Sequence, residues 1–254
     1  MRASRRAEIL EVLRQWHGCT KCKLGEMREQ KAKDTNGECG QIVLGDGNPD
    51  ADLVVIGIGP GEEEDAEGVP FRGPSGDILN DYLGRVQIDR REIFMMNIVA
   101  CRPHSRVYDA KFKRNREENR DPTSDERQAC RPLWQELLYL VDPLLVVALG
   151  KPTVIEVTGQ RSVTMGMVNG MIDVCRVPGR ALDVSYPVMA MYHPAFLSRS
   201  GDTFRGGPWH RAEIAWRRTA YYLDILRNRY RGVPIPDRGY KRKDMFLIKG
   251  GIPK

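Results

Sequence analysis

The sequence predicts an α/β fold with three layers, α/β/α, around a central, mostly parallel four-stranded sheet. Four short apolar runs show little alternation of apolar and polar residues, which is typical of strands buried on both faces. Stretches with helical patterning separate these runs, and this order is typical of doubly wound or three-layer domains. The chain of 254 residues is long enough for one such core.

The strands and helices follow in order along the chain. The strands are expected at 52–59, 93–101, 142–150 and 186–194. Helices are expected at 75–86, where Ser75 is a suitable N-cap, at 123–141, capped by Thr123 or Ser124, and at 151–159. The first sixteen residues are interpreted as an amphipathic helix. Its apolar side holds Ile9, Leu10, Val12, Leu13 and Trp16.

Two segments do not fit the compact pattern. Residues 104–121 contain six Lys or Arg and four acidic residues, with almost no apolar residues, which predicts an exposed basic loop. Residues 231–254 are basic and rich in Pro and Gly, which predicts an extended tail. We therefore expect one domain at 1–230, with 104–121 inserted in it, and a tail at 231–254.

The composition narrows the classes of function. The net charge of +6 is compatible with a polyanionic partner. No apolar run reaches the ~18 residues of a membrane helix, and the N-terminus lacks the features of a secretory signal. We expect a cytoplasmic protein with no membrane partner, in which the six cysteines are not paired as disulfides.

The cysteines leave several possibilities open. Cys19 and Cys22 form a C-T-K-C motif, which could be redox-active, metal-binding or incidental. A thioredoxin-type motif lies between a strand and a helix, whereas this one follows a helical segment. Four thiolates can hold zinc or an iron–sulfur cluster, but spacing alone does not distinguish such a site from buried structural thiols.

The stretch GIGPGEEED at residues 57–65 raises the question of phosphate binding. A dinucleotide fingerprint needs G-x-G-x-x-G, and here Glu62 stands where the third glycine is required. No Lys-Ser/Thr pair follows, as a Walker loop would need. The four consecutive acids would repel a pyrophosphate, so we interpret them as the start of an acidic helix.

Taken in order, these motifs resemble those of the family 4 uracil-DNA glycosylases. The likeness extends from about residue 15 to residue 230 and combines several motifs that are weak singly. The matching stretches are C-x-x-C at 19–22, GDGNP at 45–49, GIGPGEEEDAEGVPFRGPSG at 57–76, N-x-x-x-C-R-P at 97–103, NRDPT at 119–123, ACRP at 129–132, VVALG at 146–150 and HPA at 193–195.

The resemblance implies a [4Fe–4S] cluster held by four cysteines. The matching positions are Cys19, Cys22, Cys101 and Cys130, whereas Cys39 and Cys175 have no counterpart. In this family the last two ligands are usually closer together in the sequence, and here the basic segment 104–121 separates them. The implied role of the cluster is structural.

The resemblance also implies roles in uracil excision, for which the base must leave the duplex. Asn97 would read uracil through its amide, and Phe71 would stack on the flipped base. His193, as a neutral imidazole, would donate to uracil O2 and stabilise the departing anion. Without the resemblance, a backbone hydrogen bond, core packing and an ordinary polar contact would be the simpler interpretations of these three residues.

The loop after His193 resembles the DNA-contacting loop of the family. Leu197 would be the apolar wedge that fills the space of the flipped base, and Ser198 and Arg199 would contact phosphates. The alternative for Leu197 is an ordinary buried leucine. Glu64 matches a family carboxylate and is expected to act as the catalytic electrostatic group.

The pocket loop departs from the family pattern. Gly57, Ile58 and Gly59 would line the uracil pocket, but the family usually reads G-E-A-P-G, so Ile58 replaces a glutamate. The first hypothesis is a monomeric enzyme that excises uracil from single- or double-stranded DNA and leaves an abasic site. The alternatives are a weak or inactive protein that binds uracil or damaged DNA, favoured by Ile58, and an enzyme with shifted specificity, favoured by a wider pocket floor at Gly59.

Overall fold

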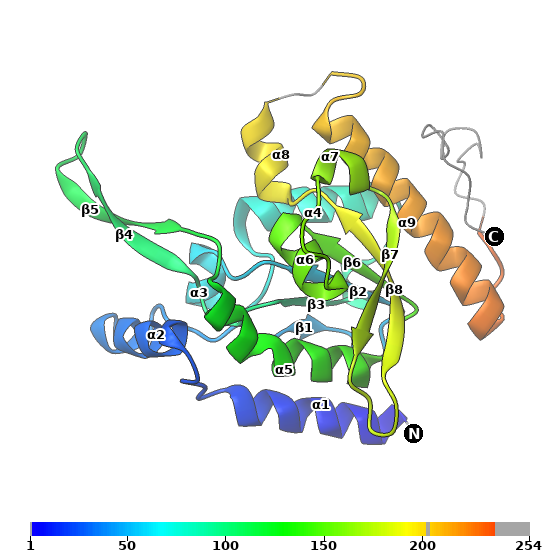
Figure 1. Ribbon diagram of the computed structural model, residues 1–254, viewed down its shortest axis with the longest axis horizontal. Coiled ribbons are helices and arrows are strands. Elements are labelled where there is room, and N and C mark those ends of the chain that lie inside the picture. The colour runs from blue at the N-terminus through cyan, green and yellow to red at the C-terminus, as the bar shows by residue number, and fades with distance from the viewer. Residues whose placement is uncertain (1, 202–203, 237–254) are drawn as a thin grey trace.

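The four apolar runs form the centre of a six-stranded sheet in a computed structural model that describes residues 2–201 and 204–236. Strands β3, β2, β6 and β8 are parallel, and β1 and β7 join antiparallel at the two edges (Figure 1). The mostly parallel sheet is confirmed, and the predicted four strands become six. In spatial order the strands are β1 Asp46–Gly47, β3 Phe94–Asn97, β2 Leu53–Gly57, β6 Leu145–Leu149, β8 Val184–Met191 and β7 Ile172–Val177.

The expected helices are present, with some changes at their ends. The helix at 124–141 begins as predicted after Thr123, whose hydroxyl accepts from Glu126 N at 3.3 Å while the Glu126 carboxylate accepts from Thr123 N at 2.8 Å. The full set is α1 Arg2–Trp16, α2 Lys23–Asp34, α3 Glu62–Glu67, α4 Gly73–Arg85, the 3₁₀ turn Arg90–Glu92, α5 Ser124–Val141, α6 Lys151–Thr158, α7 Met165–Val168, α8 Pro194–Ser200 and α9 Pro208–Arg231.

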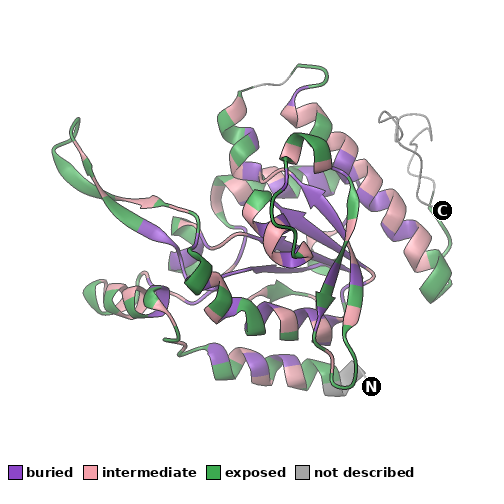
Figure 2. Cartoon of the chain, in the orientation of Figure 1, coloured by how far each residue is buried: buried purple, intermediate pink, exposed green. Residues whose placement is uncertain are grey.

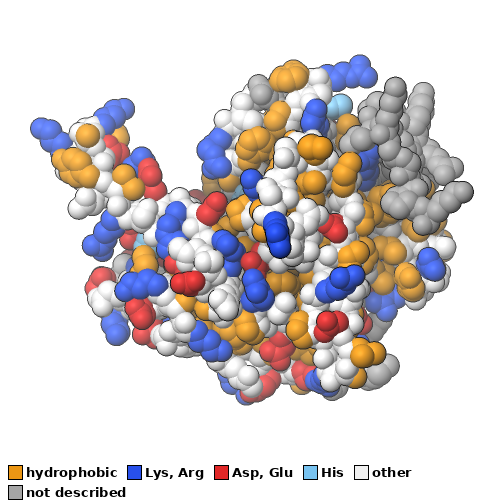
Figure 3. All heavy atoms as spheres, viewed as in Figure 1, with side chains coloured by type: hydrophobic (Ala, Val, Ile, Leu, Met, Phe, Trp, Pro, Cys, Tyr) orange, Lys and Arg blue, Asp and Glu red, His pale blue; other side chains and the backbone are white. Residues whose placement is uncertain are grey.

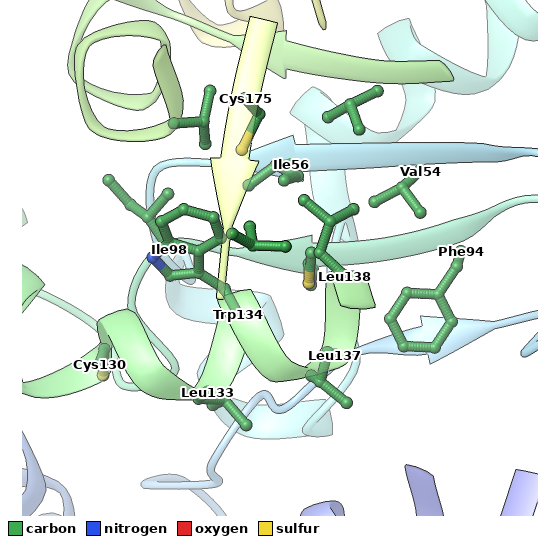
Figure 4. Packing of buried hydrophobic residues seen from close by; sticks show 14 of the residues in the cluster. Val54, Ile56, Phe94, Ile98, Cys130, Leu133, Trp134, Leu137, Leu138 and Cys175 are labelled. Carbon is green, nitrogen blue, oxygen red and sulfur yellow. The ribbon is translucent and has the colours of Figure 1, made fainter. Parts of the chain in front are cut away.

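Alternating side chains of the central strands build two apolar cores, one on each face of the sheet (Figure 2). Along β2, Val54 and Ile56 pack toward α5 and α6, whereas Leu53 and Val55 pack toward α4 and α9. Figure 4 shows the first of these cores, where Trp134 of α5 lies among strand residues. The three-layer arrangement is thus confirmed, and α1 packs on the outer side of α5.

Two expectations about helix faces and ends need correction. Leu10 was expected on the apolar side of the first helix but is 56% exposed, because only Ile9, Val12 and Trp16 face α5. Helix α4 begins before the expected cap Ser75, since Arg72 occupies the N-cap position and Pro74 lies in the first turn. Proline suits a first helical turn because no intrahelical N–H is required there.

The basic segment 104–121 is not a loop, as was expected from its composition, but an antiparallel hairpin. Strands β4 His104–Asp109 and β5 Arg114–Asn119 pair in continuous register from His104 with Asn119 to Asp109 with Arg114. The hairpin stands away from the main sheet (Figure 1). Backbone pairing alone defines its strands, so the sequence shows no apolar alternation that could reveal them.

The C-terminal part of the described chain is dominated by α9, which the sequence reading did not anticipate. Its inner side chains, including Ala215, Trp216 and Leu223, cover the sheet face opposite α5. It ends at Arg231, and residues 237–254 of the expected tail lie outside the described residues. Across the described part of the chain, none of the helices combines the length and apolar character that a membrane span requires.

Candidate active site

A pocket of about 470 Å³ opens at the carboxyl ends of the parallel strands. From β2 the chain continues to β3 on one side, and from β3 it crosses to β6 on the other side. Ligands bind in such sheets at this switch point, so the pocket lies where the topology places it. It is lined by Ile58, Gly59, Pro60, Gly61, Glu64, Phe71, Ser75, Asn97, Pro103, Asn119, Arg120, Asp121, Gly150, Lys151, Pro152, Met165, Tyr192, His193, Ala195, Phe196 and Arg199.

Asn97 closes strand β3 at the floor of the pocket, opposite Gly57 of β2 in the register. A Cβ atom at Gly57 would lie 2.3 Å from Asn97 Oδ1, so only glycine leaves room for this amide. The Asn97 side chain is buried, and its Nδ2 has no hydrogen-bond partner among the described residues. Because buried polar atoms are nearly always paired, this free donor indicates a place for a ligand acceptor.

Phe71 lies beside Asn97, held by an unusual backbone conformation. Its φ is 56°, in the left-handed region, and its ring is only 3% exposed. The tip of the ring would be 2.9 Å from a Cβ at Gly57, so the ring and the Asn97 amide occupy the same corner of the pocket. A flat ring and an amide edge together form a surface suited to a planar, hydrogen-bonding ligand.

Glu64 holds this corner together from below. Its two carboxylate oxygens accept from the backbone N–H groups of Gly61 and Phe71, which join the start of α3 to the turn that carries the ring. Burial raises the pKa of Glu64, although these backbone donors oppose the rise. Glu64 lines the pocket as expected, but both oxygens are already engaged, which favours a positioning role over the expected catalytic one.

His193 follows strand β8 and caps helix α8. Its Nδ1 accepts from the backbone N–H of Ala195 at 3.2 Å, so a neutral imidazole carries its proton on Nε2. Burial lowers the pKa of His193 to about 4, and the nearby Arg199 guanidinium adds to the effect. The side chain is therefore neutral at pH 7, and its Nε2–H is available as a donor.

The two remaining loop positions, Ile58 and Gly59, differ in what they do. A Cβ at Gly150 would lie 3.2 Å from Ile58 Cδ1 and 3.1 Å from His193 Cβ, so these two atoms are no more than about 6 Å apart. Ile58 thus places an apolar group close to the imidazole. A Cβ at Gly59 would lie 2.8 Å from Val99 Cγ2, so this glycine permits close packing and does not widen the pocket floor.

Helix α8 corrects the expected DNA wedge. Leu197 was expected to protrude, but it is 1% exposed and packs in the core beneath α8. Its neighbour Phe196 is 42% exposed, lines the pocket and stacks on Tyr192 with ring centroids 5.1 Å apart. Successive residues of a helix point about 100° apart, so a buried position 197 turns position 196 outward. Ser198 and Arg199 are exposed, as expected.

The structure adds pocket residues that the sequence reading did not assign. Asn119 ends strand β5, and its Oδ1 accepts from Arg102 Nε at 2.8 Å. Lys151 begins α6 directly after β6, and Tyr192 directly precedes His193. The signal for Asn119 was present, since it belongs to the NRDPT motif. Position next to a strand end could have indicated the other two.

Comparison with known proteins assigns this geometry to a family. The sequence profile of the uracil DNA glycosylase superfamily matches residues 44–216, which is more than half of the chain.

The chain belongs to the uracil DNA glycosylase superfamily.

Within the superfamily, the chain is similar to proteins named type-4 uracil-DNA glycosylase. The one from Thermotoga maritima is 30% identical over 199 residues, which cover 77% of this chain and 86% of that protein. Those from Pyrobaculum aerophilum and Saccharolobus solfataricus are each 29% identical. Their alignments cover 71% and 74% of this chain and 80% and 79% of the respective relatives.

The four cysteines singled out by the resemblance to this superfamily gather on one side of the sheet. Cys101 and Cys130 are buried in the core under α5, and Cys19 and Cys22 pack against the same core. Burial raises the pKa of Cys101 to about 12, and repulsion from the thiols of Cys130, Cys22 and Cys19 adds to the rise. The four thiols are therefore close enough to interact electrostatically, as ligands of one group must be.

The spacing of these thiols bears on the kind of group they fit. Among the residues that the structure describes, no three His, Cys, Asp or Glu side chains converge closely enough to hold a single metal ion. An iron–sulfur cube is larger than one ion, so its thiolates stand further apart than those around zinc. The donor set of four thiols fits such a cube.

The other two cysteines stand apart from this group. Cys175 is fully buried on β7, where burial alone raises the pKa of its thiol to about 12. In Figure 4 it lies across the packed core from Cys130. Cys39 follows α2 and is half-buried. All six cysteines are free thiols, as expected from the sequence.

Proposed function

We propose that this protein excises uracil from DNA by hydrolysing the N-glycosidic bond, and that it leaves an abasic site. The observation that carries the proposal is the buried Asn97 amide, whose Nδ2 has no partner and which lies beside the Phe71 ring in the pocket. The type-4 relatives support the same reaction by their names. A protein that only binds damaged DNA is not favoured, because the reading and the leaving-group residues are both in place.

Recognition of uracil follows from the amide geometry. Nδ2 of Asn97 donates to uracil O4, and Oδ1 accepts from uracil N3–H, while Phe71 stacks on the flipped ring. Cytosine offers an amino group and a bare N3 at these places, so both contacts would be lost. A site whose buried polar groups are left unpaired rejects the wrong ligand strongly. Gly57 is needed because any side chain there would displace the amide.

Bond cleavage follows from the imidazole. When the bond between the sugar C1′ and uracil N1 breaks, its electron pair moves onto the base, and the sugar becomes cationic. The Nε2–H of neutral His193 donates to uracil O2 and stabilises that anion. A water then attacks C1′ and loses a proton to solvent. A neutral imidazole suits this reaction, because an imidazolium would repel the cationic sugar; the lowered pKa of His193 keeps it neutral.

The duplex must be held open while the base occupies the pocket. Phe196 is the exposed apolar side chain at the pocket mouth, so it takes the wedge role that the sequence assigned to Leu197. Insertion of an apolar side chain between bases is an established way to distort a duplex. Ser198 and Arg199, on the exposed side of α8, contact the phosphates.

The [4Fe–4S] cluster is held by Cys19, Cys22, Cys101 and Cys130. When bound it supplies no chemistry to the hydrolysis; it joins the loop between α1 and α2 to β3 and α5. Protein purified without air is expected to be brown and to contain iron and sulfide, and Cys130→Ser is expected to lose both. A colourless protein with stoichiometric zinc would overturn this assignment. The protein acts as a monomer in the cytoplasm, since one chain supplies every group named here.

An abasic-site assay tests the reaction. Oligonucleotides containing uracil, cytosine or thymine at one position are incubated with the protein, and abasic sites are cleaved with alkali. Uracil alone is expected to yield product. His193→Ala and Asn97→Ala are each expected to slow excision about a hundredfold, the usual loss for one transition-state hydrogen bond of ~3 kcal/mol. Asn97→Asp is expected to shift preference toward cytosine, since a carboxylate accepts from its amino group. Binding of uracil DNA without excision of any base would favour the binding protein.

A further inference from the structure

The hairpin β4–β5 rises directly from the wall of the pocket. Pro103 precedes β4 and Asn119 ends β5, and both line the pocket. Each strand has six residues, so at ~3.3 Å per residue the hairpin reaches roughly 20 Å from the pocket rim. In the space-filling view the hairpin forms a separate lobe, with a hollow between it and the body (Figure 3).

The base of the hairpin is fixed to the body by buried ion pairs. Glu117 accepts from Lys31 Nζ of α2 at 2.9 Å and from Arg102 Nη1 at 3.2 Å. Just beyond β5, Arg120 pairs with Glu126 of α5 at 2.6 Å. Because these partners belong to helices of the domain, the orientation of the hairpin relative to the pocket is defined and not left to a flexible linker.

The far end of the hairpin carries aromatic rings among cations. Phe112 is 60% exposed and Tyr108 is 63% exposed. Lys111 Nζ lies 5.3 Å and Arg114 Cζ 5.6 Å from the centroid of the Phe112 ring. Large exposed aromatic side chains are unfavourable in water, so a ring presented on an arm of this kind indicates a partner.

The charge of the hairpin indicates the kind of partner. Among the described residues no acidic group pairs with Arg106, Lys111, Lys113 or Arg114, although all four are exposed. The acids of the hairpin are already engaged. Asp109 pairs with Arg116 at 3.4 Å and accepts from two backbone N–H groups of the turn, Glu118 pairs with Arg116, and Glu117 binds the body. The arm therefore presents uncompensated positive charge together with exposed rings.

We propose that the hairpin binds the DNA strand that leaves the pocket, with its cations on phosphates and the Phe112 ring on a base or sugar. Cations interleaved with aromatic rings are the usual surface for a nucleic-acid strand. Phosphates follow one another every ~3.4 Å along one strand, so the arm spans about six nucleotides. The inference rests on the proposed function only in taking DNA as the substrate, and it adds a second contact region outside the pocket.

The decisive experiment varies the length of the DNA. Single-stranded oligonucleotides carry one uracil with two to twelve nucleotides on the 5′ side, the 3′ side or both, and their Kd is measured by fluorescence anisotropy. For the wild-type protein we expect affinity to rise steeply on one side until about six flanking nucleotides are present. The double variant Lys111→Ser with Lys113→Asn is expected to lose this rise. Asn suits position 113, where φ is 50°.

Matched controls separate a local contact from net charge and from misfolding. Arg6→Ser with Arg229→Ser removes the same charge from α1 and from the end of α9, where both side chains are exposed. This control is expected to keep the length dependence. The hairpin variant is expected to reduce the slope of log Kd against log salt by roughly two, one for each lost phosphate contact, whereas the control leaves it unchanged. Both proteins are expected to keep the wild-type Tm.

The ring is tested separately. Phe112→Ala is expected to weaken binding of long oligonucleotides about fivefold or more, a typical loss for a stacked base, and to leave two-nucleotide flanks unaffected. Equal length dependence in wild type and the Lys111/Lys113 variant would overturn the proposal and indicate a protein partner for the arm. Binding to DNA without uracil tests the arm even if no excision occurs, and excision from short substrates tests the pocket alone, so the two failures can be told apart.

Discussion

Replacement of Ile58 by glutamate tests whether an apolar neighbour keeps the catalytic imidazole neutral. Ile58 Cδ1 lies no more than about 6 Å from His193 Cβ. A carboxylate at that separation stabilises an imidazolium by about 3 kcal/mol at an effective dielectric constant of ~20. One pKa unit corresponds to ~1.4 kcal/mol, so the pKa of His193 should rise by about two units, from about 4 to near 6.

The consequence for activity depends on pH in opposite ways for the two proteins. In the wild type the imidazole is neutral above pH 4, so single-turnover excision of uracil should be constant between pH 8 and about pH 5. In Ile58→Glu the neutral fraction declines about tenfold per pH unit below pH 6. At pH 8 both imidazoles are neutral, and there the carboxylate should raise the rate by stabilising the cationic sugar. The ratio of variant to wild-type rate should therefore rise with pH.

Two measurements check this prediction. The pH profile of single-turnover excision gives the kinetic pKa, and NMR titration of the histidine rings gives it directly. The chain has only four histidines, so His193→Asn suffices to assign the resonance. Ile58→Gln, similar in size but uncharged, is the control and should keep the wild-type profile. A His193 pKa that stays within half a unit of the wild type in Ile58→Glu would refute the reasoning.

Three further substitutions test the other parts of the pocket. Gly57→Ala places a Cβ 2.3 Å from the Asn97 oxygen, so excision should fall at least a hundredfold while Tm changes little, as the abasic-site assay and thermal unfolding can show. Glu64→Gln replaces an acceptor of the Phe71 N–H by an amide that cannot satisfy both backbone donors, so stability should fall by ~1–3 kcal/mol in urea; loss of rate at unchanged stability would instead indicate direct catalysis. Phe196→Ala should slow excision from duplex DNA much more than from single strands, and equal losses on both would argue against a wedge.

The parts of the fold that the sequence predicted are those encoded by burial. The four central strands are continuous apolar runs, since both of their faces are covered, and the helix after Thr123 carries its own capping box. The edge strands escaped notice because β1 has only two residues and β7 is partly exposed. The hairpin escaped because its strands are held by backbone bonds between charged residues.

The candidate site was predictable where the chemistry depends on residue type. The amide of Asn97 and the imidazole of His193 are recognisable in their motifs, and the structure brings both to one pocket. The orientation of side chains was not predictable. Leu197 and Phe196 are adjacent, and only the rotation of α8 decides which of them faces the core. Likewise, Glu64 is one of four consecutive acids, and only the fold of the Phe71 turn shows which one is held by backbone donors.

The packing of α1 on α5 has a consequence for how the protein is made. Residues Ile9, Val12 and Trp16 of the first helix are buried by a helix that ends at Val141. A ribosome adding 5–20 residues per second needs roughly 6–25 s to bring that partner out of the exit tunnel after the first helix has been made. During this interval the apolar stripe of the nascent chain is exposed, so early binding by a chaperone should raise the yield of folded protein.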